Sequence, residues 1–163
     1  KQRVLTLFNP ESDRLGAGWN IIQSKTAIGS GGWEGLGWTQ GSQAQLDFLP
    51  EGHTDFIIAV LAEEFGFRGV LLLFLIYAVI LGRGLVITWR AQSSFARILG
   101  GALVATFFFG LVVNLGMVSG LLPVVGVPLP MVSYGGTAMV SMMIAFGMLT
   151  AISTERRITR TMR

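Results

Sequence analysis

The sequence predicts an all-α integral membrane protein, a polytopic helical bundle in which a large outer loop precedes three transmembrane helices. The 163 residues are 52% hydrophobic and only 13% charged, with a mean hydropathy of +0.63. Typical soluble domains carry about 25% charged residues. Residues 98–154, which are 57 consecutive positions, contain no charged side chain. Two membrane crossings of about 20 residues with a connector account for such a stretch, and an ordinary soluble core does not.

Residues 1–67 form the predicted outer loop, because they are polar, rich in glycine and hold eight of the nine acidic residues. Within this loop, residues 18–32 predict a short helix with Ile21, Ile22 and Ile28 on one rough apolar face. A connector of this length is unusual, and long loops are commonly functional or disordered.

The first crossing is predicted over residues 69–90. Its strictly uncharged core, residues 69–82, ends at Arg83, which must reach an interface or lie inside protein. The helix would be longer if DFIIAVLAEEFG, residues 55–66, packs beneath the crossing. A short polar turn over residues 91–97 follows.

The second crossing is predicted over residues 98–119, and the third over residues 137–152. Between them lies the proline-rich segment, residues 120–136, whose three prolines forbid a regular helix. The segment is nevertheless too apolar for a free aqueous loop. Irregular backbone survives at membrane depth only where protein buries it or where it lines a cavity. We therefore predict that this segment is partly re-entrant.

The basic residues predict the orientation in the membrane. Arg83, Arg90 and Arg97 mark the turn after the first crossing, and the basic tail, residues 154–163, carries four more arginines. Cytoplasmic loops carry an excess of lysine and arginine. The turn and the tail are therefore predicted to be cytoplasmic, and residues 1–67 extracytoplasmic. The pI near 10 then reflects topology rather than a nucleic-acid surface.

The stretch FLPEGHTDF, residues 48–56, is the candidate site, because it places Glu51, His53 and Asp55 directly before an apolar run. Asp55 has two interpretations. It could cap the following helix, or it could be an ionised carboxylate that takes a proton from a sugar hydroxyl or holds a divalent cation. Glu51 and Asp47 would share a face with Asp55 in a helix over residues 47–55, but Pro50 disfavours that helix, so they can approach Asp55 only through a turn. A lone loop histidine is more often an ordinary polar residue, and its spacing from the acids is not that of metal ligands.

Other polar features favour structural roles. Glu64 stands four residues before Arg68, a spacing that favours an ion pair on a helix. Glu63 and Glu64 are both expected to lie in solvent or at the membrane interface. Asn114 is expected to lock helix packing. The glycine run over residues 27–38 lacks the ending of a nucleotide-binding loop, so no nucleotide cofactor is predicted.

Several long stretches resemble the SEDS family of peptidoglycan polymerases. They are NPESDRLGAGWNIIQSKTAIGSGG (9–32), GWTQGSQAQLDFLPE (37–51), FLPEGHTDFIIAVLAEEFG (48–66) and NLGMVSGLLPVVGVPLPMVSYGG (114–136). The last stretch is closer to the elongation branch of the family than to the division branch. The resemblance covers essentially the whole chain and implies that it corresponds to the C-terminal part of a bundle of about ten transmembrane helices.

The resemblance implies an enzyme of the bacterial cytoplasmic (inner) membrane. This enzyme is an inverting peptidoglycan glycosyltransferase that polymerises lipid II into glycan strands during elongation and rod-shape maintenance. Asp55 is the implied catalytic residue, and it is also the candidate ligand of a divalent cation, Mg²⁺ or Mn²⁺. Asp47, Glu51, His53 and Lys25 are expected to bind substrate or support Asp55.

The implied partners are lipid II, membrane lipids, a class B penicillin-binding protein acting as transpeptidase, and the other membrane proteins of the rod complex. Two alternatives come from other functional classes. A lipid II flippase would also have a membrane cavity and proline-broken segments. A scaffold without catalytic activity would only recruit the transpeptidase.

Overall fold

The computed structural model describes residues 17–41 and 54–161, with the side chains of the last helix described as far as Thr154. Every regular element in these ranges is a helix, as predicted. The helices are α2 (Ala17–Gly31), α4 (Ile57–Trp89), α5 (Ser94–Val118) and α6 (Gly136–Thr161). Three of them are long and apolar enough to cross a membrane, namely α4, α5 and residues 136–154 of α6.

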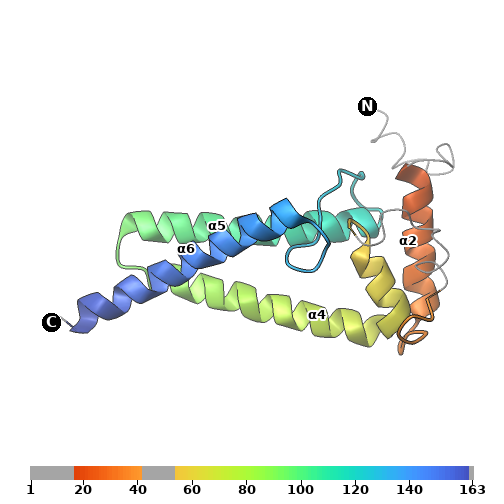
Figure 1. The fold of residues 1–163 in the computed structure, drawn as a ribbon, viewed down its shortest axis with the longest axis horizontal. Coiled ribbons are helices and arrows are strands. Elements are labelled where there is room, and N and C mark those ends of the chain that lie inside the picture. Colours follow the sequence, from red (N-terminus) through yellow and green to blue (C-terminus); the bar gives the residue numbers. More distant parts are fainter. Residues whose placement is uncertain (1–16, 42–53, 162–163) are drawn as a thin grey trace.

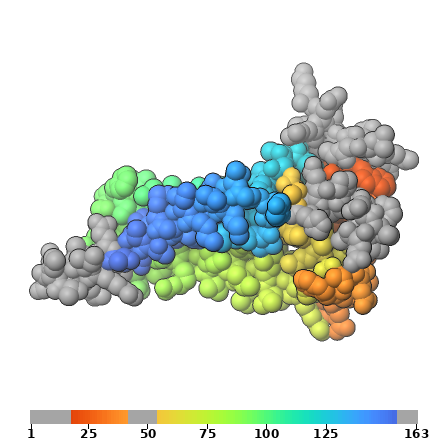
Figure 2. All heavy atoms as spheres, viewed as in Figure 1, coloured from red at the N-terminus to blue at the C-terminus, as the bar shows by residue number. Residues whose placement is uncertain are grey.

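The three long helices form an open bundle, and α2 lies across one end of it (Figure 1). A tight turn joins α4 to α5 at the end that we call the Arg90 end. From this turn the two helices spread apart as far as the bend in α4. The first residues of α4 (yellow) then run back to the end of α5, at what we call the Asp55 end, where α2 crosses. Helix α6 contacts both α4 and α5, and it lies over them on the face shown in Figure 2.

The helices extend beyond the predicted crossings. Helix α5 begins at Ser94 rather than at residue 98, because the hydroxyl of Ser93 caps it by accepting a hydrogen bond from the Ala96 amide at 3.1 Å. Helix α6 continues through the predicted tail to Thr161. The largest extension is that of α4, which begins at Ile57, so that residues 57–67 are helical, as the alternative of a longer helix over DFIIAVLAEEFG predicts.

Helix α4 is long because it kinks at Gly66 and does not end there. Gly66 has φ 66° and ψ −166°, a conformation that is essentially restricted to glycine. The kink frees backbone groups on both sides, and the turn over residues 32–37 binds them. Carbonyls 63 and 64 accept hydrogen bonds from amides 36 and 37 at 2.9 and 3.0 Å, while amides 67 and 68 donate to carbonyls 32 and 33 at 3.0 and 3.4 Å. We call these four bonds the backbone clasp.

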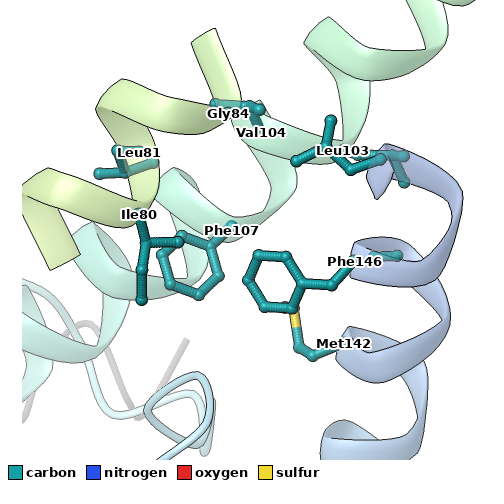
Figure 3. A pocket seen from close by; sticks show the side chains of 10 residues that line it. Ile80, Leu81, Gly84, Leu103, Val104, Phe107, Met142 and Phe146 are labelled. Atoms are coloured by element: carbon teal, nitrogen blue, oxygen red, sulfur yellow. The ribbon is translucent and has the colours of Figure 1, made fainter. Parts of the chain in front are cut away.

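The centre of the bundle is aromatic. Phe107 of α5 makes edge-on ring contacts with Tyr77 of α4 and Phe146 of α6, at centroid distances of 5.6 and 5.5 Å. Figure 3 shows Ile80, Phe107 and Phe146 facing one another across the place where the three helices meet, and only about 20 Å³ remains empty there. Close packing of this kind supplies the association energy of membrane helices, because the lipid around them is equally apolar.

Between α5 and α6, residues 119–135 have no regular secondary structure, as the three prolines predict. The segment folds back into the bundle (Figure 1). Its Pro130 carbonyl accepts a buried hydrogen bond from the Tyr77 hydroxyl at 2.7 Å. Tyr77 lies eleven residues beyond Gly66, which is about 16 Å along α4. This burial of irregular backbone within the helices supports the predicted re-entrant placement, which itself remains a prediction.

Candidate active site

Asp55 lies in the turn directly before α4, at the Asp55 end of the bundle. Its neighbour Phe56 is fully buried and occupies the cap position of the helix, where no side chain makes a capping hydrogen bond. The interpretation of Asp55 as a helix cap is therefore wrong. Among the described residues, none donates a hydrogen bond to its carboxylate.

Asn114 fixes the position of Asp55 from α5. Its amide nitrogen donates to the Asp55 carbonyl at 2.9 Å and to the Val127 carbonyl at 2.7 Å. The side chain is fully buried, and its Oδ1 atom has no hydrogen-bond partner among the described residues. The prediction that Asn114 locks packing is confirmed, but sequence reasoning missed its partners. One amide joins the start of α4 to the proline-rich segment.

Gly126 brings the backbone of the proline-rich segment against the Asp55 side chain. It has φ 82°, in the left-handed region that favours glycine, and a methyl group at this position would lie 3.1 Å from Asp55 Oδ2. One side of the Asp55 carboxylate therefore lies against main-chain atoms of this segment. Asp55 is partly buried, and this desolvation raises the pKa of its carboxyl above the ordinary value. A raised pKa makes Asp55 a better proton acceptor than a solvated aspartate once it is ionised.

Lys25 approaches the other end of the same segment from α2. A methyl group at Gly120 would lie 2.8 Å from Lys25 Nζ. Helix α2 is held there by Ser24, whose buried hydroxyl donates to the Val118 carbonyl at 2.9 Å. The Lys25 side chain is exposed, and no ion pair is found for it within the described ranges. The structure thus brings the Lys25 ammonium and the Asp55 carboxylate, neither of which is paired with a described residue, to one proline-rich segment.

With this geometry in place, comparison with known proteins is informative. The family profile named for FtsW, RodA and SpoVE, described as cell cycle protein, matches residues 1–158 of the chain. The chain belongs to the FtsW/RodA/SpoVE family. The resemblance to SEDS proteins is therefore confirmed, and the chain is a multi-pass membrane protein, as its three candidate spans indicate.

Two named relatives of this FtsW/RodA/SpoVE chain are peptidoglycan glycosyltransferases. Peptidoglycan glycosyltransferase MrdB of Escherichia coli K12 is 57% identical over 157 residues, which cover 96% of this chain and 42% of MrdB. Peptidoglycan glycosyltransferase RodA of Treponema pallidum is 40% identical over 154 residues, which cover 94% of this chain and 36% of that protein. The chain therefore spans less than half the length of these relatives.

A solved structure has the same helical arrangement. Its subject is the structural coordination of polymerization and crosslinking by a peptidoglycan synthase complex. The match has a TM-score of 0.77 at 28% sequence identity and covers 95% of this chain and 41% of the solved chain. The predicted fold class, an all-helical membrane bundle, is confirmed by this likeness.

Three of the predicted site residues of this FtsW/RodA/SpoVE chain, Asp47, Glu51 and His53, lie outside the described residues. Within residues 17–41 and 54–161, no three acidic or histidine side chains converge on one point. Mg²⁺ is usually held by one or two carboxylates together with water and substrate phosphates. Asp55 could supply one such ligand, so the divalent cation remains a prediction.

The neighbouring acids differ from their predicted roles. Glu63 is fully buried rather than solvated, because α2 and Gly41 cover it. Glu64 accepts a hydrogen bond from the Thr39 amide at 3.1 Å. Arg68 pairs instead with Glu34 at 3.2 Å. The contacts of Glu64 and Glu34 join the turn after α2 to α4 at the protein surface.

Proposed function

We propose that the protein is a peptidoglycan glycosyltransferase that polymerises lipid II into glycan strands during cell elongation. The proposal rests on the position of Asp55. It is a partly desolvated carboxylate that receives no hydrogen bond from a described residue, at one end of a membrane-spanning bundle. The chain that holds it is 57% identical to a protein named peptidoglycan glycosyltransferase.

Asp55 acts as the general base in this mechanism. It removes the proton from the 4-hydroxyl of the acceptor sugar while that oxygen forms a bond to the anomeric carbon of the donor. The bond from this carbon to the lipid pyrophosphate breaks, and the pyrophosphate leaves with the electron pair. Attack opposite the leaving group inverts the anomeric configuration. Because both substrates are tethered to lipid, the base must stand at headgroup depth, and the first residues of a membrane-spanning helix meet that need.

Lys25 is the cation that faces the leaving group. The pyrophosphate gains negative charge as the bond breaks, so a positioned cation stabilises the transition state more than the ground state. Lys25 Nζ lies against Gly120 and Asp55 Oδ2 lies against Gly126 of the same segment. A donor sugar above this segment would contact the base on one side and the cation on the other.

The proposal includes the predicted location and partners. The Asp55 end is extracytoplasmic and the Arg90 end cytoplasmic, in the cytoplasmic membrane of a bacterium. A class B penicillin-binding protein is the expected partner, and the solved relative belonging to a peptidoglycan synthase complex supports this expectation. Asp47, Glu51 and His53 are expected to complete the substrate site.

The test is glycan synthesis from labelled lipid II by the full-length protein in detergent, comparing wild type with Asp55→Asn and Glu34→Gln. Asp55→Asn keeps the shape of the side chain and removes the base, so we expect polymer to disappear from gels. Glu34 is an exposed acid in the same part of the protein, and its variant should retain wild-type synthesis. Lys25→Met should lower the turnover rate more than Lys25→Arg. Wild-type synthesis by Asp55→Asn would exclude the mechanism.

The same experiment separates the alternatives. A flippase has no two compartments to act between in detergent, so it would produce no glycan from lipid II under any condition. A scaffold would retain the transpeptidase in a pull-down with Asp55→Asn and show no dependence of synthesis on this residue.

A further inference from the structure

A groove between α4 and α6 lies in the half of the bundle nearer the Arg90 end. It has a volume of about 380 Å³ and is lined by Val79 and Ile87 of α4 and by Phe146 and Leu149 of α6. Thr150 also lines it, but its hydroxyl already donates to the Gly147 carbonyl at 2.8 Å. The groove adjoins the small aromatic cavity of Figure 3, with which it shares Ile80, Gly84, Phe146 and Leu149. Its surface is therefore suited to a hydrocarbon chain.

One charged side chain, Arg83, lines this apolar groove. Arg83 lies six residues before the end of α4 at Trp89, which places it about 9 Å inside the helix end. The side chain is exposed, and no ion pair is found for it among the residues that the structure describes. An arginine within a membrane span needs an anion or interfacial water. By contrast, the groove of about 230 Å³ between α2, α4 and α5 has no charged lining residue.

The charge of this part of the chain defines the anion. From residue 69 onward the sequence has seven arginines and one acid, Glu155, which is a surplus of six positive charges. Three of these arginines, Arg83, Arg90 and Arg97, belong to the described part of the Arg90 end. A guanidinium matches a phosphate with two parallel hydrogen bonds. A lipid that carries its own ammonium group would bring a cation into this positive surrounding, whereas an anionic lipid would not.

We propose that the groove between α4 and α6 binds one anionic phospholipid, with an acyl chain along Val79, Ile87 and Phe146 and the phosphate on Arg83. Basic pockets between transmembrane helices are typical binding sites for anionic headgroups. The apolar lining and the single cation at its side match the two chemical halves of such a lipid. The site is separate from Asp55, because it lies in the other half of the bundle.

The test is native mass spectrometry of the delipidated full-length protein titrated with dioleoylphosphatidylglycerol or dioleoylphosphatidylcholine. We expect the wild type to bind phosphatidylglycerol more tightly. Arg83→Gln should weaken that binding about fivefold, the effect of one basic residue near an anionic surface. Arg90→Gln removes the same charge at the same end of the bundle, but Arg90 does not line the groove. The logarithm of its fold-change in affinity should therefore be less than half of that for Arg83→Gln.

Further variants separate the headgroup from the acyl chain. Arg83→Lys keeps the charge without the paired hydrogen bonds, so it should bind with intermediate affinity. Thr150→Trp fills the groove from α6 and should lose phosphatidylglycerol even though Arg83 remains. Soluble glycerol 3-phosphate should not displace the lipid, since it lacks the chain. Equal losses in Arg83→Gln and Arg90→Gln would overturn the proposal. So would equal binding of the two lipids, or no binding by the wild type because another helix of the protein fills the groove.

Discussion

Gly66 is the residue on which the shape of α4 depends most directly, so Gly66→Ala is the most informative single substitution. The glycine has φ 66° and ψ −166°. A methyl group there would lie 2.7 Å from the Glu34 carbonyl carbon and 2.7 Å from the Trp33 carbonyl oxygen, and closer still to the Gly35 amide nitrogen. All of these are backbone atoms, so no side chain can rotate to relieve the contact.

The expected loss of stability follows from two contributions. An alanine in this backbone region costs about 1–3 kcal/mol of strain. The methyl group also pushes the turn over residues 32–37 away from α4, and each of the four bonds of the backbone clasp contributes about 0.5–1.5 kcal/mol. If two of the four bonds are lost, the free energy of unfolding falls by about 2–6 kcal/mol in total.

Denaturation in mixed detergent micelles, followed by circular dichroism, measures this change. Gly82→Ala is the matched control, because Gly82 lies in the same helix and has no atom within 4 Å of the added methyl group. That variant should be neutral or more stable by up to about 1 kcal/mol, since alanine favours helix. If Gly66→Ala and Gly82→Ala unfold together with wild type, the kink is not held by the backbone clasp and the reasoning fails.

Further outcomes are expected for three residues, Asn114, Asp55 and Tyr77. Asn114→Leu leaves the carbonyls of Asp55 and Val127 unpaired, so it should cost about 2–4 kcal/mol in the same denaturation assay and also reduce glycan synthesis; wild-type stability would contradict this. Because burial raises the pKa of Asp55, the base loses its charge at a higher pH than a solvated aspartate, and synthesis should fall as pH drops through that raised pKa. Below the pKa that Asp55 has in the unfolded chain, the shift stabilises the folded state, and this stabilisation is lost as pH rises through the pKa in the folded state. At pH 7 the folded protein therefore holds a partly desolvated charge. Asp55→Asn removes that charge, so the variant should unfold at a higher temperature than wild type at pH 7. Tyr77→Phe removes the 2.7 Å bond to Pro130 but keeps the ring contacts, so denaturation should show a loss of about 1 kcal/mol.

The sequence predicts the long helices well because their signal is local. Membrane helices need only a long uncharged apolar segment, and the chain from residue 98 to residue 154 contains one. The proline-rich segment has a local signal as well, since three prolines in an apolar stretch exclude both a regular helix and a solvated loop. Helix α2 was predicted from its three isoleucines, although Ile28 proves to be exposed and only Ile21 is fully buried.

The kink and the partners of the acids could not be predicted, because they depend on contacts between distant residues. The carbonyls freed at Gly66 are bound by a turn some thirty residues earlier in the chain, so the glycine alone does not show whether α4 ends or bends. Periodicity placed Glu64 beside Arg68, but Thr39 and Glu34 compete for them from the same turn. Likewise, nothing near Asn114 in the sequence indicates that it binds the Asp55 carbonyl, 59 residues away.

The separation of these partners along the chain determines when the site can form during synthesis. The hydrogen bond from Asn114 to Asp55 spans 59 residues, and the bond that holds α2, from Ser24 to Val118, spans 94. Asp55 therefore emerges from the ribosome long before the residues that fix it. A nascent chain that stops before Val127 lacks the second carbonyl that Asn114 binds. The proposed base is therefore positioned only after α5 and the segment that follows it have been inserted into the membrane.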